Sequence, residues 1–570
     1  MSKAWLAHYD PGVPEYADVA RFNSLAQMFE EAVSRFRDRP AFSSMGRELS
    51  YGDLDKASAR LARHLRNVLN LQHGDRVAIM LPNVLQYPIA FFGVVRAGLV
   101  VVNVNPLFTA PELVHQLRDS GAKTVIVLEN FCATLEEALR HIVVPNVIVT
   151  SVGDELGMAK GLLTNFVVRC IRKLIAPWQI DGYQRWRRVT ARRRSIAAPN
   201  VVLERGDTAL LQYTGGTTGF AKGAILTHGN VLANALILGN WFAAINDGRR
   251  EKYLVALPLY HAFALICQVV HRFIFGGCGV LIANPRDLDG LVAEMQRHRF
   301  RNLAGVPSLF QALARYPGIR KVDFSETAAC CSGGAPLTTA VAEAWKAATG
   351  LTIIDGYGLT EVAGVAAMNP LGQRSSRSGI GFPVCSTEIE IRREDGSLAA
   401  PTEPGEIHIR GPQVMLGYFN QPEETARVLD ASGFLATGDI ATMSEDGYLT
   451  LVERKKDMAI VSGFNVYPSE IDDVLTRHYG ILEAAAVSVP DPETGEAIIA
   501  CVVRRDLNLT EAAVIEHARA SLTRYKVPRC VVFLDTLPKT PVGKVLRRVL
   551  QEQVGKLAER AGSKSTEAQQ

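Results

Sequence analysis

The sequence lacks the spacing that a zinc site or a disulfide framework would need. None of its nine cysteines forms a Cys-x-x-Cys pair, and no histidines follow at zinc-finger distances. We therefore predict a reducing compartment in which most of the cysteines are small buried apolar residues. Their positions are Cys132, Cys170, Cys267, Cys278, Cys330, Cys331, Cys385, Cys501 and Cys530.

The sequence also lacks an apolar run long enough to cross a bilayer. The most apolar region, residues 254–283, is interrupted by Pro258, His261 and Arg272, so about 18 consecutive apolar residues never accumulate. The first residues do not have the basic and then apolar order of an export signal, because the apolar residues 5–7 lead directly into His8. We expect a cytoplasmic protein.

A strong net charge is missing as well. The formal charge is +4 over 570 residues, which is too small for the broad positive field of a nucleic-acid binder, so we expect no nucleic-acid partner. The apolar fraction of 48% and the charged fraction of 21% are those of an ordinary globular protein. A chain of this length predicts roughly two to four domains or subdomains.

One segment departs from this balance. Residues 160–194 combine many arginines with apolar side chains and with Trp178 and Trp186. This composition is typical of a helix at a membrane surface. Two interpretations stay open: a solvated face on an insertion that covers the core, or peripheral contact with the inner face of the cytoplasmic membrane.

The order of apolar runs predicts how the chain is organised. Short runs at 77–81, 100–104, 124–128 and 147–150 are separated by segments long enough for helices, which favours parallel sheets. After about residue 380, alternating apolar and polar residues with turn signals predict a small antiparallel barrel or sheet. The charged string from Glu453 to Asp457 is the best domain boundary.

A glycine-rich stretch, residues 213–224, carries the clearest chemical signal. Its glycines let backbone N–H groups approach an anion, its threonines add hydroxyl donors, and Lys222 adds a positive charge. It is not a Walker A loop, because Ala221 precedes the lysine and Gly223 follows it. A plain hairpin turn is the alternative. The predicted nucleotide-binding residues here are Tyr213, Thr214, Gly215, Gly216, Thr217, Thr218, Gly219, Lys222 and Gly223.

Further motifs follow downstream in order. They are Ala-Leu-Pro-Leu-Tyr-His at 256–261, Asp-Gly-Tyr-Gly-Leu-Thr-Glu at 355–361, Thr-Gly-Asp at 437–439, Glu-Arg-Lys-Lys-Asp at 453–457, Val-Ser-Gly-Phe-Asn-Val-Tyr-Pro at 461–468 and Pro-Lys-Thr-Pro-Val-Gly-Lys-Val-Leu-Arg at 538–547. With the glycine-rich stretch, they make the chain resemble the acyl-adenylate-forming superfamily of acyl-CoA synthetases, firefly-type luciferases and peptide-synthetase adenylation domains. The resemblance runs from about Trp5 to Gln553 and is closest to bacterial long-chain fatty acid CoA ligases. Ala221 departs from the proline that many members carry.

The resemblance implies an α/β fold in two parts. A large N-terminal domain, residues 1–454, would hold parallel-rich sheets with helices and a small β-barrel subdomain at about 380–452. Residues 455–457 would form a hinge. Residues 458–570 would form a small, mobile α+β domain that carries the catalytic lysine. From the sequence we expect that lysine, Lys544, to follow a tight bend at a glycine and to open a helix that continues through residues 545–548.

The resemblance also implies a reaction. A long-chain fatty acid would react with ATP to give an acyl-adenylate and pyrophosphate, and the thiol of coenzyme A would then displace AMP. Joining two anions requires charge cancellation and alignment. Lys544 would bridge the carboxylate and phosphate oxygens, His261 would position the acid, and Lys456 would change its backbone torsion so that the small domain turns between the two steps.

The remaining site residues are likewise implied by resemblance. Mg²⁺, which needs few protein carboxylates when phosphate oxygens are present, would be held by Glu361 and Thr214. Asp439 and Arg454 would hold the ribose hydroxyls. The other predicted nucleotide-binding residues are Gly334, Ala335, Asp355, Gly356, Tyr357, Gly358 and Thr360, and those lining a pantetheine tunnel are Ser462, Gly463 and Phe464.

Several alternatives stay open. Residues 230–275 are apolar, which fits an alkyl tail better than an amino acid, but medium-chain and aryl acids also fit. The chain could instead load a carrier protein, which a rotation-blocking insertion after Asp457 would favour, although none is apparent. A luciferase-like oxygenase would consume oxygen. Retention of Lys544, Glu361 and Asp439 argues against a non-catalytic membrane-surface protein. The oligomeric state is open, a homodimer being one option.

Overall fold

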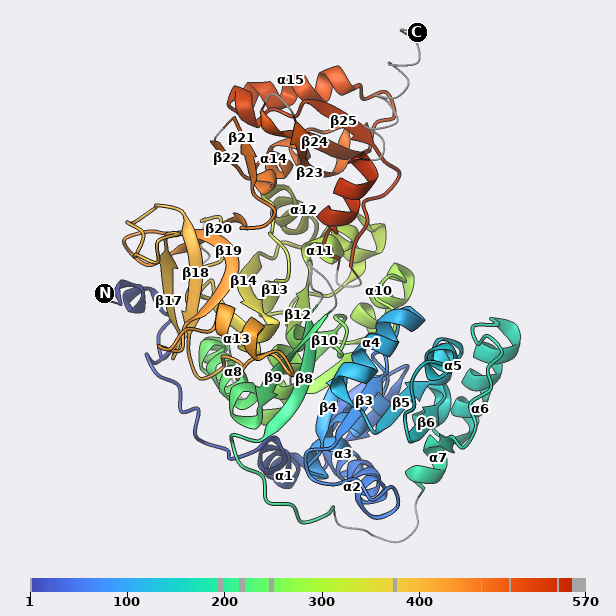
Figure 1. The fold of residues 1–570 in the computed structure, drawn as a ribbon. Coiled ribbons are helices and arrows are strands. Elements are labelled where there is room, and N and C mark those ends of the chain that lie inside the picture. Colours follow the sequence, from blue (N-terminus) through green and yellow to red (C-terminus); the bar gives the residue numbers. More distant parts are fainter. Residues whose placement is uncertain are drawn as a thin grey trace.

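The computed structural model describes the following residues of the 570-residue chain: 3–191, 198–214, 221–245, 251–372, 377–462, 464–491, 494–540 and 543–555. A large body holds most of the helices and strands, and a smaller carboxyl-terminal unit lies against helix α11 (Pro307–Arg315) at one end (Figure 1). No helix among the described residues is long and apolar enough to span a membrane.

The first large sheet has seven strands in the order β7-β6-β5-β3-β4-β8-β9. Its central strands are parallel, as the apolar runs predict, and β9 returns antiparallel to β8 across the glycine-rich stretch. The strands are β3 (Arg76–Met80), β4 (Val100–Asn103), β5 (Thr124–Leu128), β6 (Asn146–Thr150), β7 (Gln184–Arg185), β8 (Thr208–Thr214) and β9 (Lys222–Thr227). The helices that join them are α2 (Tyr51–Asn67), α3 (Gln86–Arg96), α4 (Ala110–Ser120), α5 (Cys132–Leu139), α6 (Met158–Phe166) and α7 (Trp186–Val189).

The second large sheet has nine strands in the order β16-β15-β14-β13-β12-β10-β11-β1-β2. They are β1 (Pro40–Ser44), β2 (Arg47–Ser50), β10 (Lys252–Val255), β11 (Cys278–Leu281), β12 (Asn302–Gly305), β13 (Ala329–Ser332), β14 (Ile353–Leu359), β15 (Gly364–Met368) and β16 (Phe382–Pro383). The accompanying helices are α9 (His271–Ile274), α10 (Leu288–Arg297), α11 (Pro307–Arg315) and α12 (Thr339–Thr349).

Two helices join these sheets into one body. Helix α1 (Leu25–Phe36) begins where the Ser24 side chain accepts a hydrogen bond from the Gln27 N–H, which satisfies a free backbone donor at the helix start. Helix α8 (His228–Trp241) is buried along nearly its whole length and contacts both β9 and β15. Because α8 has no exposed face, its sequence lacks the division into an apolar and a polar face that a surface helix shows.

The region predicted as a small barrel forms a four-stranded antiparallel sheet in the order β17-β18-β19-β20. Its strands are β17 (Glu388–Arg392), β18 (Gly405–Arg410), β19 (Leu435–Met443) and β20 (Leu449–Arg454), with α13 (Pro422–Val428) between β18 and β19. Residues 455–457 make a turn after β20, in which the Asp457 N–H donates to the Arg454 carbonyl at 2.9 Å.

The carboxyl-terminal unit has its own sheet and its own core. Its elements are β21 (Ala459–Val461), β22 (Phe464–Val466), α14 (Pro468–Thr476), β23 (Ile481–Asp491), β24 (Gly495–Arg504), α15 (Glu511–Ser521) and β25 (Cys530–Phe533). The prediction that Lys544 opens a helix is wrong. Residues 544–546 are extended, with Val545 bridged to Lys539, and the helical turns begin at Arg547.

Candidate active site

An aspartate, an arginine and a tyrosine from three strands meet beside the turn that follows β20. Asp439 on β19 and Arg454 on β20 are cross-strand partners, and their side chains pair at 3.1 Å. The Tyr357 hydroxyl on β14 donates to the other oxygen of the Asp439 carboxylate at 2.7 Å. Asp439 is buried, so both of its oxygens are held by these two partners. The structure thus brings the predicted ribose-binding pair next to the Asp-Gly-Tyr-Gly motif.

Lys544 reaches this group from the carboxyl-terminal unit. Burial of its ammonium and the positive charge of Arg454 lower the pKa of Lys544 to about 8, while the Asp439 carboxylate acts in the opposite direction. Lys456 in the turn after β20 lies close enough to add a further positive charge. Lys544 therefore belongs to the same group of charged side chains as Asp439 and Arg454.

The loop that carries Lys544 packs tightly on the large body. A Cβ atom added to Gly543 would lie 2.3 Å from the Ser308 hydroxyl oxygen and 3.2 Å from a methyl of Val306. Gly543 also has a φ of +78°, a conformation that other residues rarely adopt. Val306 is also the side chain nearest to Gly334, which is one of the predicted nucleotide-binding residues. Only glycine fits at this contact.

Glu361 lies in a second polar cluster, formed around Tyr418. The Tyr418 hydroxyl donates to the Glu361 carboxylate at 2.8 Å, and burial raises the pKa of Glu361. The Lys222 ammonium lies 5.2 Å from the centre of the Tyr418 ring and pairs with Glu424 at 2.5 Å. The glycine-rich hairpin and the Glu361 turn are therefore neighbours, as their predicted shared role requires.

Thr214 is the strand partner of Lys222 at the end of the β8–β9 hairpin. Strand β8 contacts the short helix η8 (Thr360–Val362) that carries Glu361, so a carboxylate and a hydroxyl come from adjoining elements. Carboxylate and hydroxyl oxygens are hard ligands that suit Mg²⁺. The predicted residues Gly215, Gly216, Thr217, Thr218 and Gly219 lie outside the described residues.

The Asp-Gly-Tyr-Gly segment leaves no room for a side chain at its second glycine, Gly358. A Cβ on Gly358 would lie 1.7 Å from the Gly364 carbonyl oxygen, so any substitution would displace the β14–β15 pair. Burial raises the pKa of Asp355 to about 8, and its Oδ1 atom has no hydrogen-bond partner among the described residues. A buried carboxyl group with an unpaired oxygen can form a hydrogen bond with a bound ligand.

An elongated cavity continues from this segment into the second sheet. His261 and Phe263 lie at the cavity wall together with Gly333, Gly334, Tyr357 and Thr360. Burial lowers the pKa of His261 to about 4, so its imidazole is neutral near pH 7. A neutral ring suits the predicted positioning role better than transfer of a proton from an imidazolium.

Sequence reasoning missed the residues that hold His261 in place. The buried Asn83 amide donates to the carbonyls of Val255 and Leu257 and accepts from the Leu259 N–H, each at 2.9 Å. Tyr87 adds a bond to the Leu259 carbonyl at 2.7 Å. These contacts span about 170 positions in the chain, and no local pattern around Asn83 could have indicated them. Tyr418 and Ser308 were missed for the same reason.

The predicted pantetheine residues lie apart from this cluster. Ser462 follows β21 and has a φ of +51°, and Phe464 is exposed and stacks on Tyr525 with ring centres 4.7 Å apart. Both belong to the carboxyl-terminal unit, where β21 and β22 lie (Figure 1). Gly463 lies outside the described residues.

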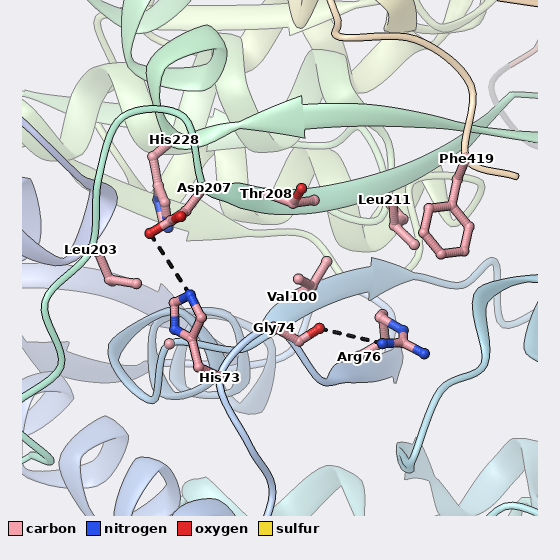
Figure 2. Close-up of a pocket in the computed structure, with 11 residues that line it drawn as sticks. His73, Gly74, Arg76, Val100, Leu203, Asp207, Thr208, Leu211, His228 and Phe419 are labelled. Carbon is pink, nitrogen blue, oxygen red and sulfur yellow. Dashed lines mark hydrogen bonds and ion pairs between the residues drawn. The ribbon is translucent and has the colours of Figure 1, made fainter. Parts of the chain in front are cut away.

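A separate hollow lies at the opposite ends of the first sheet's strands (Figure 2). Its walls carry His73 and Asp207, whose side chains face each other at 3.9 Å, and the buried His228. Burial lowers the pKa of His228 to about 4. None of the predicted site residues that the structure describes lines this hollow, so the candidate active site and the hollow are distinct places on the molecule.

Comparisons with known proteins agree with this arrangement. The chain is 46% identical over 555 residues to a long-chain-fatty-acid–CoA ligase of Yersinia pestis, covering 97% of this chain and 98% of the relative. It is 45% identical over 564 residues to one of Escherichia coli O157:H7, covering 98% and 100%. A crystal structure of an anthranilate CoA ligase with anthranoyl-AMP superposes with a TM-score of 0.82 at 24% identity, covering 96% and 99%, and shares the fold.

Two family models match the two parts of the chain. The model described as AMP-binding enzyme matches residues 29–419, and the model described as AMP-binding enzyme C-terminal domain matches residues 470–544, ending on the lysine of the carboxyl-terminal loop. The first match alone covers more than half of the sequence. The chain therefore belongs to the AMP-binding enzyme family.

Proposed function

We propose that this protein is a ligase that joins a long-chain fatty acid to coenzyme A through an acyl-adenylate, with release of pyrophosphate and AMP. The observation that carries the proposal is the placement of Lys544 beside Asp439 and Arg454, where a cavity leads away from the Asp-Gly-Tyr-Gly segment. A nucleotide held at the charged cluster would present its α-phosphate to an acid lying in that cavity. The full-length similarity to long-chain-fatty-acid–CoA ligases supports this assignment.

The chain's own residues supply charge and alignment for the first step. The Lys544 ammonium would lie between the carboxylate and the α-phosphate and reduce their mutual repulsion. Asp439 would accept hydrogen bonds from the ribose, and Arg454 would keep that carboxylate in place. Asn83 holds the segment that leads to His261 through the backbone of residues 255–259. His261 would then fix the carboxylate of the acid so that it faces the α-phosphorus.

Magnesium fits the residues at Glu361 and Thr214. One carboxylate and one hydroxyl from adjoining elements leave the remaining positions of an octahedron to phosphate oxygens and water. When bound, the ion would neutralise charge on the ATP phosphates. Glu361 would keep its orientation through the Tyr418 hydroxyl.

The second step requires the carboxyl-terminal unit to turn. Residues 455–457 form the turn between the two parts, and partial burial together with the Arg454 charge lowers the pKa of Lys456 to about 8. Rotation there would withdraw Lys544 and bring Ser462 and Phe464 toward the cleft, where they would line the path of coenzyme A. In this scheme residues 1–454 and 458–570 act as two bodies.

The function is tested by acid-dependent exchange of labelled pyrophosphate into ATP, followed by acyl-CoA formation, over acids from short to long chain. We expect exchange with palmitate or oleate and Mg²⁺, and AMP and acyl-CoA when coenzyme A is added. Exchange without thioester formation would instead indicate loading of a carrier protein, and oxygen uptake with adenylate would indicate a luciferase-like reaction. An absence of exchange with every acid would reject the proposal.

We further propose that the segment from Met158 to Leu174 binds the surface of an anionic membrane, consistent with a cytoplasmic protein at the inner face. Helix α6 and the π-helical segment η4 (Val167–Ile171) expose an apolar set, and the neighbouring Arg172 and Lys173 are exposed as well. Apolar side chains beside basic ones suit an interface of acyl chains and anionic headgroups. The exposed apolar residues are Met158, Leu162, Leu163, Phe166, Ile171 and Leu174.

The tryptophans of this region do not take part. Trp186 is fully buried, and its ring N–H donates to Glu155 at 2.7 Å. Trp178 packs edge-on against Tyr183. The membrane surface is therefore assigned to the aliphatic and phenylalanine side chains of α6 and η4.

Replacing Leu163 and Phe166 together by serine should weaken binding to phosphatidylglycerol vesicles, measured by sedimentation, by about a hundredfold, because each buried apolar side chain contributes roughly 1.5 kcal/mol or more. The matched control is Leu507→Ser, which removes a similarly exposed side chain from the carboxyl-terminal unit. Wild type should bind neutral phosphatidylcholine vesicles weakly. Equal binding by the double variant and the control would contradict the assignment.

A further inference from the structure

The far end of the cavity that starts at Tyr357 is polar, although its walls are apolar. Gln268, Arg272 and Asn302 line it there, and each is at least 95% buried. Arg272 is engaged, since its guanidinium pairs with Glu251 at 2.7 Å and lies over the Phe242 ring at 4.7 Å. A simple alkyl terminus needs no polar groups at this position, so their presence calls for an explanation.

Two of these side chains have an unused hydrogen-bonding atom. Gln268 donates from Nε2 to the Leu254 carbonyl at 3.2 Å, which fixes the orientation of its amide and leaves Oε1 as an acceptor without a partner among the described residues. The Asn302 Nδ2 atom donates to no oxygen or nitrogen there, and the Cys331 thiol beside it is only a weak acceptor. An unsatisfied buried polar atom is unfavourable, so a ligand that satisfies both atoms would gain affinity.

The strand register places the two amides close together. Asn302 is opposite Tyr253 in the parallel β10–β12 pair, one position from Leu254, whose carbonyl holds Gln268. Neighbouring strands lie about 4.8 Å apart. Ala304 and Cys331, cross-strand partners that also line the cavity, continue the wall on the same face as Asn302. An acceptor and a donor therefore share one end of one cavity.

Resting on the proposed function, we propose that the acyl pocket selects fatty acids that carry a hydroxyl group far from the carboxylate. A hydroxyl would donate its hydrogen to Gln268 Oε1 and accept a hydrogen from Asn302 Nδ2, which matches the two unused atoms one to one. A ketone could only accept, and a methyl terminus would leave both atoms unpaired.

The position of the hydroxyl follows from the length of the strand. Asn302 lies three residues before Gly305, the carboxyl end of β12, which is about 10 Å along the strand. With carbon–carbon bonds of about 1.5 Å, an extended zigzag chain covers this distance in about eight carbons. A hydroxyl at about carbon 8 to 10 would reach the pair, whereas one at carbon 3 would remain beside His261.

The test compares ω-hydroxydecanoate, decanoate and 3-hydroxydecanoate in the pyrophosphate exchange assay with full-length enzyme. We expect kcat/KM for ω-hydroxydecanoate to exceed that for each of the other two acids by about tenfold or more. Equal or lower values for ω-hydroxydecanoate would overturn the proposal and would indicate that a resident water satisfies the two amides. Exchange with decanoate alone would leave the proposed ligase function intact.

Variants provide a second, independent readout. Asn302→Leu and Gln268→Leu should each lower kcat/KM for ω-hydroxydecanoate about tenfold and leave or raise that for decanoate, so the preference is lost. Decanoate turnover thereby reports whether the variant folds. If a variant is insoluble or does not bind nucleotide, the comparison of the three acids with the wild-type enzyme decides between the outcomes. A parallel loss for both acids in a soluble, nucleotide-binding variant would indicate a structural role and contradict the proposal.

Discussion

Replacing Lys544 by alanine should lower acyl-adenylate formation by about a thousandfold, while thioester formation from supplied acyl-adenylate and coenzyme A stays within a fewfold of wild type. The ammonium is the group that faces Asp439 and Arg454 from the carboxyl-terminal unit, so its removal leaves two anions to approach without compensation. Pyrophosphate exchange measures the first step, and release of AMP from synthetic acyl-adenylate measures the second. Equal loss of both steps would contradict the assigned role.

The same lysine predicts a pH profile. Because burial and Arg454 lower the pKa of Lys544 to about 8, the charged form is lost as pH rises through that value, and kcat/KM of the first step should fall on the alkaline side. The residual exchange of Lys544→Ala should lack this alkaline limb. Lys539→Ala is the matched control, since Lys539 belongs to the same loop but pairs with Glu483.

Replacing Asp439 by alanine should impair both steps, because the nucleotide is held through the whole reaction. We expect the KM for ATP to rise by about a hundredfold, since removal of one partner from a buried charged pair costs about 3 kcal/mol. Arg454 and the Tyr357 hydroxyl would both lose their acceptor. ATP affinity measured by calorimetry and both half-reactions check the prediction.

The control for this substitution is Glu388→Ala. Glu388 pairs with Arg410 at 2.5 Å on the same sheet but lies on β17, which does not pair with β19. It should leave ATP affinity nearly unchanged and report any general weakening of the sheet. If Asp439→Ala altered only the first step, the ribose role would be wrong and a role linked to Lys544 would replace it.

Local patterns predicted the elements of the fold well. The apolar runs at β3, β4, β5 and β6 are strands because buried parallel strands need apolar residues on both faces. The helix expected at Lys544 does not begin there, because the Thr540 N–H donates a hydrogen bond to the Lys544 carbonyl at 2.7 Å and closes a turn. Hydrogen bonding within the loop overrides the helical propensity of the residues that follow.

Candidate site residues that lie in motifs could be named from the sequence, whereas those that act through packing could not. Asp439, Arg454 and Tyr357 belong to such motifs, and their side chains contact one another in the structure. Asn83, by contrast, acts through carbonyls of a segment about 170 positions away. Such partners follow from the fold of two sheets around α8, which no short window of sequence contains.

The pairing of Lys222 with Glu424 has a consequence for ATP binding. In the free protein the carboxylate on α13 already serves as the counter-ion of this ammonium, so an incoming triphosphate must displace it. The electrostatic benefit of recruiting Lys222 is therefore the difference between two anions and not the full attraction of one. After this exchange Glu424 would pair with Arg427 alone. Nucleotide binding would therefore change the ion pairs on α13, the helix that carries both residues.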